Sequence, residues 1–372
     1  MVDRFKEFKR LKNEPLLLAA ILAIILFTGY FVVWPVWQLM TVAQPAEYRI
    51  LVETPRWMRA LANSLYMMVI STVSCTAVAF VFAYTMTRLD VPFKKLFRFV
   101  TLLPIVSPPF IVALSYILLF GVQGIITKGL LGLQADVYGR FGLWMVQTVT
   151  FFPYAFSVIY GVMEKVSTNL EYAAYNMGAS RWRVFKDITL PLLLPGIGNA
   201  FLVSFIESVA DFTNPIMIGG DFDTLAAYIY MQISNFDTRS SSAMAVVLLT
   251  ISMILFIIEK YFLERKSVAT LTGKASRVRM QIEDRSVRIP TTALCAFVGL
   301  FVIGMYAMVP VGALFKLWGK DFSLTFKHFV NVLGRDTKPF TDSLYLSFVA
   351  SIITSLLSMI IAYLIVKKKF FG

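Results

Sequence analysis

Few of the residue types that carry out chemistry in proteins occur in this chain of 372 residues, and their positions exclude several kinds of site. The single histidine, His328, excludes a cluster of histidine metal ligands. Both cysteines, Cys75 and Cys295, lie in apolar segments, which excludes a disulfide framework and a four-ligand zinc site. We expect both cysteines to be small buried side chains and His328 to lie in a solvated loop.

Two carboxylates, those of Glu207 and Asp211, could attract or bind a cation. Glu207 and Asp211 stand four residues apart in an apolar segment, so a helix places them on one face. Ionisable groups at membrane depth are costly and are therefore candidates for function. One interpretation is a cation-attracting lining near the outer mouth of a transport pathway, with Asn214, Pro108 and Pro109 as further candidates. The alternatives are that the carboxylates are solvated or cap neighbouring helices, and that the prolines kink a helix for packing.

Motifs for an enzyme are absent from the sequence. No H-E-x-x-H segment and no pair of intramembrane aspartates occurs, which argues against an intramembrane enzyme. No G-x-x-x-x-G-K-[ST] loop occurs either, so this chain does not hydrolyse ATP itself. We therefore predict that it is not an enzyme and binds no cofactor or metal.

The elements that carry these residues belong in a membrane. Hydrophobic residues make up 58% of the chain and charged residues only 15%, although the net charge is +13. Basic residues gather between apolar runs rather than on a polar face, so a bilayer, not nucleic acid, is the predicted partner. A helix needs about 20 apolar residues to cross the bilayer. About eight segments qualify: residues 16–36, 61–86, 99–120, 141–163, 192–210, 243–258, 291–315 and 343–366.

The distribution of Lys and Arg predicts the orientation. Alternate connections and the two termini hold 24 of the 35 basic residues. Because cytoplasmic loops carry the excess of positive charge, both termini are predicted to be cytoplasmic. The connection at 211–242 is acidic, which suits the outer side.

An internal repeat divides the chain. The segment NSLY at 63–66 recurs as DSLY at 342–345, and Arg88 corresponds to Lys367 at the same offset of 279 residues. Internal repeats are typical of transporters. We expect a complete six-helix unit at 1–263, a basic linker at 264–289, and the first two helices of a second unit at 290–372. We expect the chain to be a truncated form of a two-unit protein.

The connection between the fourth and fifth segments has the most informative spacing. The segment EYAAYNMG occupies 171–178, and ITLP follows nine residues later at 188–191. We predict a short helix at 169–177, a left-handed turn at Gly178, and a second helix at 179–187. Pro191 would then open the fifth helix, where its missing N–H costs nothing. The alternative is an amphipathic helix on lipid headgroups.

This spacing resembles the E-A-A loop of permease subunits in binding-protein-dependent ABC importers, whose pattern is E-A-A, three residues, G, nine residues, I-x-L-P. Tyr172 stands at the family's Glu position and Glu171 one residue earlier, which leaves the ionic partner of Glu171 open. The resemblance implies an all-α polytopic permease in a bacterial inner membrane, with loop 164–191 docking on a cytoplasmic ATPase dimer that binds ATP and Mg²⁺. It also implies a periplasmic or surface substrate-binding protein. The implied coupling residues are Glu171, Ala173, Ala174, Gly178, Trp182, Ile188, Leu190 and Pro191.

The substrate is less specified. The segment ADFTNP at 210–215, followed by Gly219 and Gly220, is similar to ferric-iron permeases with two fused units. Phosphonate, phosphosugar, thiamine and polyamine importers remain alternatives within the same class. A secondary transporter without an ATPase is the remoter alternative, and a truncated chain would need homodimerisation to present two coupling loops.

Overall fold

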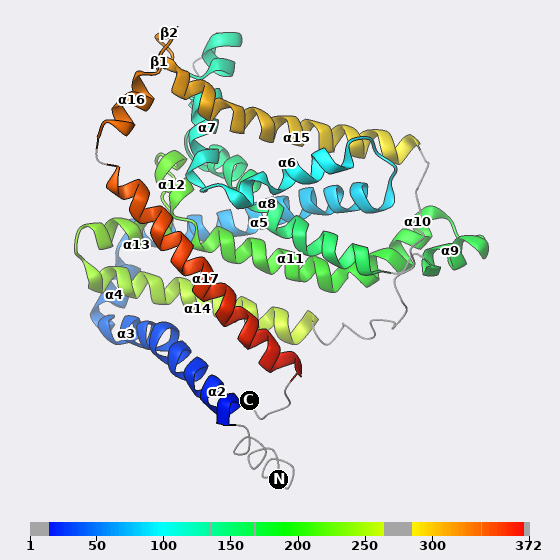
Figure 1. The fold of residues 1–372 in the computed structure, drawn as a ribbon, viewed down its shortest axis with the longest axis horizontal. Helices are drawn as coiled ribbons and strands as arrows, with labels where there is room; N and C mark the ends of the chain where they lie inside the picture. The colour runs from blue at the N-terminus through cyan, green and yellow to red at the C-terminus, as the bar shows by residue number, and fades with distance from the viewer. Residues whose placement is uncertain (1–14, 134–135, 167–168, 264–284, 336, 368–372) are drawn as a thin grey trace. The chain divides into compact units, whose positions relative to one another are not determined.

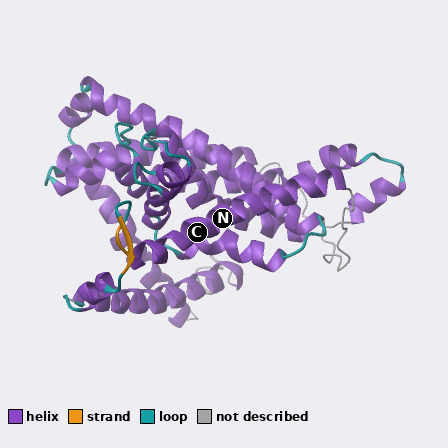
Figure 2. Cartoon of the chain, turned by 90° about the horizontal axis from the view of Figure 1, so that it is seen from above, coloured by secondary structure: helices purple, strands orange, loops and turns teal. Residues whose placement is uncertain are grey.

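The computed structural model describes residues 15–133, 136–166, 169–263, 285–335 and 337–367 (Figure 1). Within these ranges the chain is almost entirely helical, with one two-stranded antiparallel hairpin, as Figure 2 shows. Eight of the described helices are long and apolar enough to cross a membrane, which confirms the predicted all-α polytopic class. Most of the predicted linker, 264–284, lies outside the described residues.

The chain forms two compact units. The smaller unit takes residues 1–42 and 325–372, and the larger unit takes residues 43–324. The smaller unit contains a first span built of α2 (Pro15–Thr28), the π-helix η1 (Gly29–Val33) and α3 (Trp34–Val42), together with α16 (Lys327–Leu333) and α17 (Lys338–Lys367). Its large apolar side chains are mostly exposed, as a lipid-facing surface requires.

The larger unit holds the remaining elements. Its outer helices are α4 (Pro45–Glu53), α6 (Lys94–Val106), α7 (Phe110–Phe120), η2 (Ile125–Leu130), α12 (Thr213–Ile218), α13 (Leu225–Ser234), α14 (Thr238–Leu263) and α15 (Arg285–Leu314). Its central helices are α5 (Pro55–Arg88), α8 (Arg140–Lys165) and α11 (Leu190–Ala210). The hairpin is β1 (Phe315–Leu317) with β2 (Asp321–Leu324).

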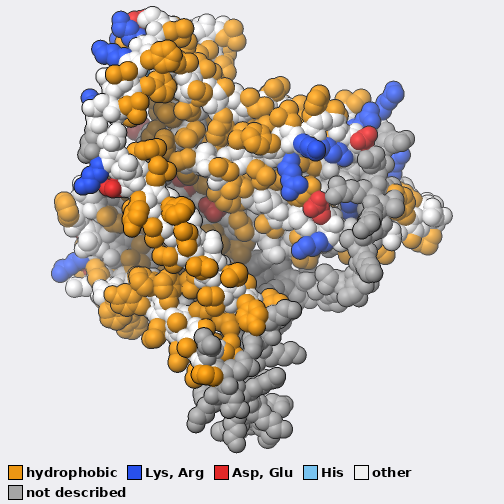
Figure 3. Space-filling view, in the orientation of Figure 1, with side chains coloured by type: hydrophobic (Ala, Val, Ile, Leu, Met, Phe, Trp, Pro, Cys, Tyr) orange, Lys and Arg blue, Asp and Glu red, His pale blue; other side chains and the backbone are white. Residues whose placement is uncertain are grey.

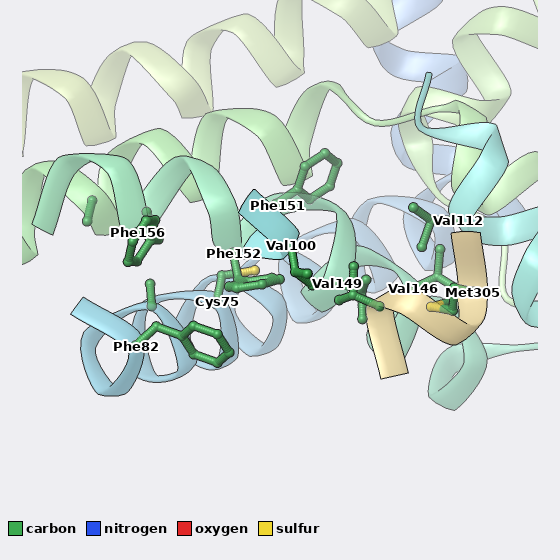
Figure 4. Close-up of a cluster of buried hydrophobic side chains, with 14 of the residues drawn as sticks. Cys75, Phe82, Val100, Val112, Val146, Val149, Phe151, Phe152, Phe156 and Met305 are labelled. Atoms are coloured by element: carbon green, nitrogen blue, oxygen red, sulfur yellow. The ribbon is translucent and has the colours of Figure 1, made fainter. Parts of the chain in front are cut away.

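The three central helices pack along one another because α5 presents a stripe of small side chains. Ser71, Cys75, Ala79 and Ala83 recur every fourth residue and are completely buried. Small residues at this spacing let helix backbones approach closely. Large side chains then fill the space on either side of the stripe, such as Phe82 of α5 and Phe152 of α8, whose rings lie 5.5 Å apart (Figure 4). Cys295 is fully buried as well, so both cysteines are core side chains, as predicted.

The third predicted span is interrupted by its prolines. Helix α6 ends at Val106 and α7 begins at Phe110, so Pro108 and Pro109 form the break. Both prolines are exposed, and their carbonyl oxygens accept the first amide hydrogen bonds of α7, at 3.1 Å each. A proline has no amide hydrogen to donate, so the helix restarts here rather than continuing.

The spatial grouping differs from the repeat seen in the sequence. Helix α15 packs within the larger unit, against α5, α6 and α7. The Phe120 and Phe301 rings lie 5.9 Å apart, and the Ser107 and Tyr306 hydroxyls share a hydrogen bond. The surface that a helix buries, and not the sequence repeat that contains it, decides which compact unit it joins. The division at 1–263, 264–289 and 290–372 stays a prediction from the sequence.

Charge and apolar surface are separated along the long helices. Figure 3 shows apolar side chains over most of the visible surface, with Lys and Arg in a few separate groups. This distribution is the one that a helix bundle needs in a bilayer, because its centre is apolar and its two surfaces are polar.

Candidate functional site

A pair of short helices around Gly178 forms the element that the sequence singled out. Helix α9 (Asn169–Asn176) ends in a glycine turn, in which Gly178 has a φ of +82°. The Gly178 amide donates to the Tyr175 carbonyl at 2.9 Å, and the Ala179 amide donates to the Ala174 carbonyl at 3.0 Å. This pair of bonds is the Schellman arrangement that ends a helix at a left-handed glycine. The predicted turn is confirmed.

The second helix differs from the predicted one in its bounds. The chain forms α10 (Arg181–Val184), whose first turn is capped by the Ser180 hydroxyl accepting from the Arg183 amide at 3.4 Å. A π-helical turn, η3 (Phe185–Thr189), follows and leads directly into α11. Pro191 is the second residue of α11, as predicted, but η3 runs into α11 without a break, so its missing N–H lies inside a continuous helix rather than at a helix start. The wide π turn means that α10, η3 and α11 form one continuous helical rod, which the sequence pattern did not indicate.

The inner face of this element, made by Glu171, Val184, Phe185 and Thr189, packs on the end of α5. The Phe185 ring makes edge contacts with Tyr84 and Phe80, at centroid distances of 5.9 and 6.2 Å. Val184 is 2% exposed beside it. These contacts tie the short helices to the helix that forms the centre of the bundle.

Glu171 finds its ionic partner on the same end of α5. Its Oε1 lies 3.3 Å from Arg88 Nη2, and the two side chains are only 4% and 5% exposed. The Thr189 hydroxyl donates to the same Oε1 at 2.8 Å. Burial and the nearby negative charge of Glu171 raise the pKa of Tyr175. The sequence left this partner open because Arg88 read only as one of the basic residues that set the orientation.

The outer face of the element is apolar and mostly basic, with one exposed acidic residue, Asp187, which pairs with Arg183 at 3.7 Å. Met177 is 81% exposed and Trp182 is 70% exposed, and the Trp182 ring stacks on Phe185 at 5.8 Å. Arg181, Arg183 and Lys186 are exposed around them. An exposed aromatic anchor with an arginine rim is typical of a surface that docks on another protein.

The structure thus divides the eight predicted coupling residues between two faces. Glu171 and Ala174 are buried, and Ile188 and Leu190 are partly buried. Ala173, Gly178, Trp182 and Pro191 are exposed. The predicted coupling set left out Arg88, Thr189 and Phe185, which hold the inner face. Basic residues at the ends of spans and acidic residues in loops are common in the sequence. Only the fold shows that Arg88 and Glu171 are a pair.

The candidate pathway residues are brought together only in part. Asp211 is 8% exposed, and its carboxylate accepts from Gln147 Nε2 at 2.8 Å and from the Asn214 amide and side chain at 3.1 and 2.9 Å. Gln147 Oε1 in turn accepts from the Ser71 and Ser208 hydroxyls at 2.8 and 3.0 Å. This buried network joins α5, α8, α11 and α12.

Glu207 lies one turn before Asp211 and is partly buried. Its carboxylate makes no hydrogen bond or ion pair with the described residues, although it lies close enough to Tyr154 and Asp211 to interact with them electrostatically. Pro108 and Pro109 lie in the α6–α7 break, outside the network. Within the described ranges, no group of three or more His, Cys, Asp and Glu side chains could hold a metal ion.

Eight candidate spans and an exposed helix–glycine–helix element anchored on the central helix define a polytopic membrane protein with an exposed apolar and basic surface. Comparison with known proteins identifies its family. Residues 75–268 match the family described as binding-protein-dependent transport system inner membrane component, and the chain belongs to that family. It is accordingly a multi-pass component of the inner membrane.

Curated relatives cover different lengths of the chain. The chain is 29% identical to the putative ferric transport system permease protein FbpB 1 of Haemophilus influenzae, over 98% of this chain and 61% of that protein. It is 29% identical to the ferric transport system permease protein FbpB of Actinobacillus pleuropneumoniae, over 99% of this chain and 56% of that protein. The molybdenum transport system permease protein ModB of Escherichia coli is 30% identical over 56% of this chain. The chain spans less than two thirds of the length of the two ferric relatives.

A solved structure supports the fold. A bacterial alginate ABC transporter, in complex with an alginate-bound periplasmic protein, contains a chain that superposes with a TM-score of 0.60 at 17% identity. The superposition covers 69% of this chain and 97% of that one. At this identity the likeness concerns the arrangement of helices.

Proposed function

We propose that this chain forms part of the translocation pathway of an ATP-driven importer and couples to a cytoplasmic ATPase dimer through loop 164–191. The observation that carries the proposal is the outer face of α9 and α10. Met177 and Trp182 are exposed there although the same short helices are fixed to α5 by Phe185 and Glu171. Short helices that are packed firmly on α5 and expose apolar side chains are suited to transmit motion from a docked partner.

The ATPase is the partner that binds ATP and Mg²⁺, because this chain has no nucleotide-binding loop. The energy for transport therefore enters through the docked subunit. A periplasmic or surface binding protein delivers substrate on the opposite side of the membrane, which agrees with the family to which the chain belongs.

Trp182→Ala tests the docking surface. We expect the variant to insert and unfold like the wild type, because the side chain is exposed, but to retain the ATPase poorly during copurification in detergent. Leu130→Ala is the matched control, since Leu130 is 77% exposed in η2, far along the chain from the element. Equal retention of the ATPase by wild type and Trp182→Ala would contradict the proposal. Uptake driven by an ion gradient without any ATPase would contradict the whole class.

Both termini are proposed to be cytoplasmic, which places the element and the ATPase on the same side. The buried cysteines allow a labelling test, because neither Cys75 nor Cys295 is accessible. We expect a membrane-impermeant maleimide to label Ser234→Cys, but not Ala173→Cys, in right-side-out vesicles. Permeabilised vesicles should label both variants. The reverse pattern would invert the orientation.

Ferric iron is the proposed cargo. The support is that the two relatives matching nearly the whole chain are named as ferric transport permeases. Phosphonate, phosphosugar, thiamine and polyamine are the alternatives within the same class. Uptake of radiolabelled Fe³⁺ by cells carrying the full permease, its ATPase and its binding protein should be competed by excess unlabelled Fe³⁺ and not by the alternatives. Accumulation of one of those compounds instead of iron would reassign the cargo.

A further inference from the structure

The end of α5 carries a row of three side chains that all contact the coupling element. Phe80, Tyr84 and Arg88 follow one another at intervals of four residues, so they share one face of the helix. The first two contact the Phe185 ring. Arg88, the last residue of α5, pairs with Glu171 of α9. Among the described residues, two ring contacts and one ion pair thus attach the element to α5.

The ionic contact joins three elements at one atom. Glu171 Oε1 lies 3.3 Å from Arg88 Nη2 and accepts the Thr189 hydroxyl at 2.8 Å. Arg88 belongs to α5, Glu171 to α9 and Thr189 to η3, which continues into α11. A displacement of α9 by its partner must therefore act on α5 and on α11 together.

The burial of this pair makes the connection hard to break. Both side chains are at most 5% exposed, and an unpaired charge at such a site is strongly unfavourable. Arg88 Nε and Nη2 make no hydrogen bond to the described part of the chain. The planar guanidinium carries five N–H donors in a fixed fork, so it can face the carboxylate of Glu171 from more than one direction.

We propose that Arg88 is a positioning residue for coupling, which transmits movement of the docked element to the central helices through Glu171. The inference deepens the proposed function and rests on it. Arg88 does not contact the ATPase, because it is buried behind the element. Its loss should therefore separate two measurements, ATPase binding and transport per ATP hydrolysed, that loss of the docking surface lowers together.

Arg88→Gln is the main test, in the full complex with ATPase and binding protein in proteoliposomes. We expect ATPase copurification to stay within about twofold of the wild type, whereas substrate transported per ATP falls about tenfold. Arg88→Lys should recover part of this ratio, because it restores the charge but not the fork. Arg98→Gln is the matched control, since it removes an arginine at the start of the neighbouring α6, where the guanidinium lies over the Tyr160 ring at 5.1 Å.

Thr189→Val provides a second variant that keeps the ion pair and removes only the hydroxyl. It should lower transport per ATP by about threefold, and Thr189→Ser should restore it. This variant decides the matter if Arg88→Gln does not fold. The inference is overturned if Arg88→Gln loses ATPase binding in proportion to transport, or if transport per ATP is unchanged in both variants. Failure of the wild type to bind the ATPase would instead overturn the proposed function.

Discussion

The side-chain amide of Gln147 donates a 2.8 Å hydrogen bond to the carboxylate of Asp211, which joins the middle of α8 to the point where α11 ends. Asp211 also accepts from the backbone amide and from the side-chain amide of Asn214, so it fixes the start of α12. The sequence predicted that Asp211 lines a transport pathway. In the structure its carboxylate is instead held by three hydrogen-bond donors inside the bundle. Its first role in this structure is to position α12 against α11.

Replacing Asp211 by Asn should destabilise the larger unit. The carboxylate accepts from Gln147, from the Asn214 side chain and from the Asn214 amide, and an amide in its place turns one acceptor into a donor facing these donors. Leaving a buried group unsatisfied costs about 1–3 kcal/mol. Thermal unfolding of the purified protein in detergent should show a lower midpoint for Asp211→Asn. A midpoint equal to that of the wild type would remove the structural role of the network.

Glu207→Gln is the companion variant, one helical turn away. Because this carboxylate makes no hydrogen bond or ion pair with the described residues, its unfolding midpoint should stay close to that of the wild type. If Glu207 attracts a cation in the pathway, uptake should fall while stability holds. Normal uptake would withdraw Glu207 from the pathway.

The cost of replacing Gly178 should depend on how well the new residue tolerates left-handed backbone, not on steric room. A Cβ added there meets nothing within 4 Å, but the φ of +82° is unfavourable for residues other than glycine. Alanine should cost about 1 kcal/mol, valine more, and asparagine less, because asparagine tolerates left-handed backbone. We expect Gly178→Asp to insert normally and to lose uptake. Comparison with Gly178→Asn separates added charge from backbone strain. Normal uptake by Gly178→Asp would remove the coupling role of the turn.

Gly196 of α11 and Gly161 of α8 should respond to alanine with opposite changes in stability. A Cβ on Gly196 would lie 2.8 Å from Val162 Cγ2, whereas a Cβ on Gly161 has nothing within 4 Å. Overpacking at position 196 should cost about 1–3 kcal/mol. Alanine at position 161 should stabilise α8 by about 0.5–1 kcal/mol, since it is the better helix former. Differential scanning fluorimetry of Gly196→Ala and Gly161→Ala would show whether the two midpoints move apart. Movement in the same direction would contradict this packing.

Asp237 should make the stability of α14 depend on pH. Its carboxylate caps the helix by accepting from the Ser240 amide at 3.1 Å. The Ser240 hydroxyl and the Ser240 amide lower the pKa of Asp237. Because the folded pKa lies below the unfolded value of about 3.9, the stabilisation is present above that value and is lost as pH falls through the folded pKa.

Asp237→Ala should therefore lower stability at neutral pH by about 0.5–2 kcal/mol and flatten the acid limb of the stability curve. Asp237→Asn is the control, because its amide oxygen keeps the cap without a titrating charge. A circular dichroism melt of each variant at neutral pH and near the acid limit tests the assignment. An Asp237→Ala curve that runs parallel to the wild type through the acid range would show that the cap does not titrate.

Local patterns in the sequence were sufficient for the number of candidate spans and for the turn at Gly178, although the third predicted span, 99–120, is broken at Pro108 and Pro109. A run of about 20 apolar residues and the spacing from Gly178 to Pro191 are properties of neighbouring residues, so they survive without knowledge of the fold. The burial of Cys75 followed in the same way from its apolar surroundings. The bounds of the second short helix did not follow, because a π-helical turn at Phe185–Thr189 has no distinct local signal.

The partners of the polar groups came from packing alone. Arg88 and Glu171 are 83 positions apart, and Gln147 and Asp211 are 64 apart. Helical periodicity states which face a side chain occupies but not which face of another helix will meet it. That choice is made by the stripe from Ser71 to Ala83, whose small side chains let α5 and α8 approach closely. Asp211 is then buried against Gln147, and the packing of α9 on the end of α5 gives Arg88 its partner Glu171.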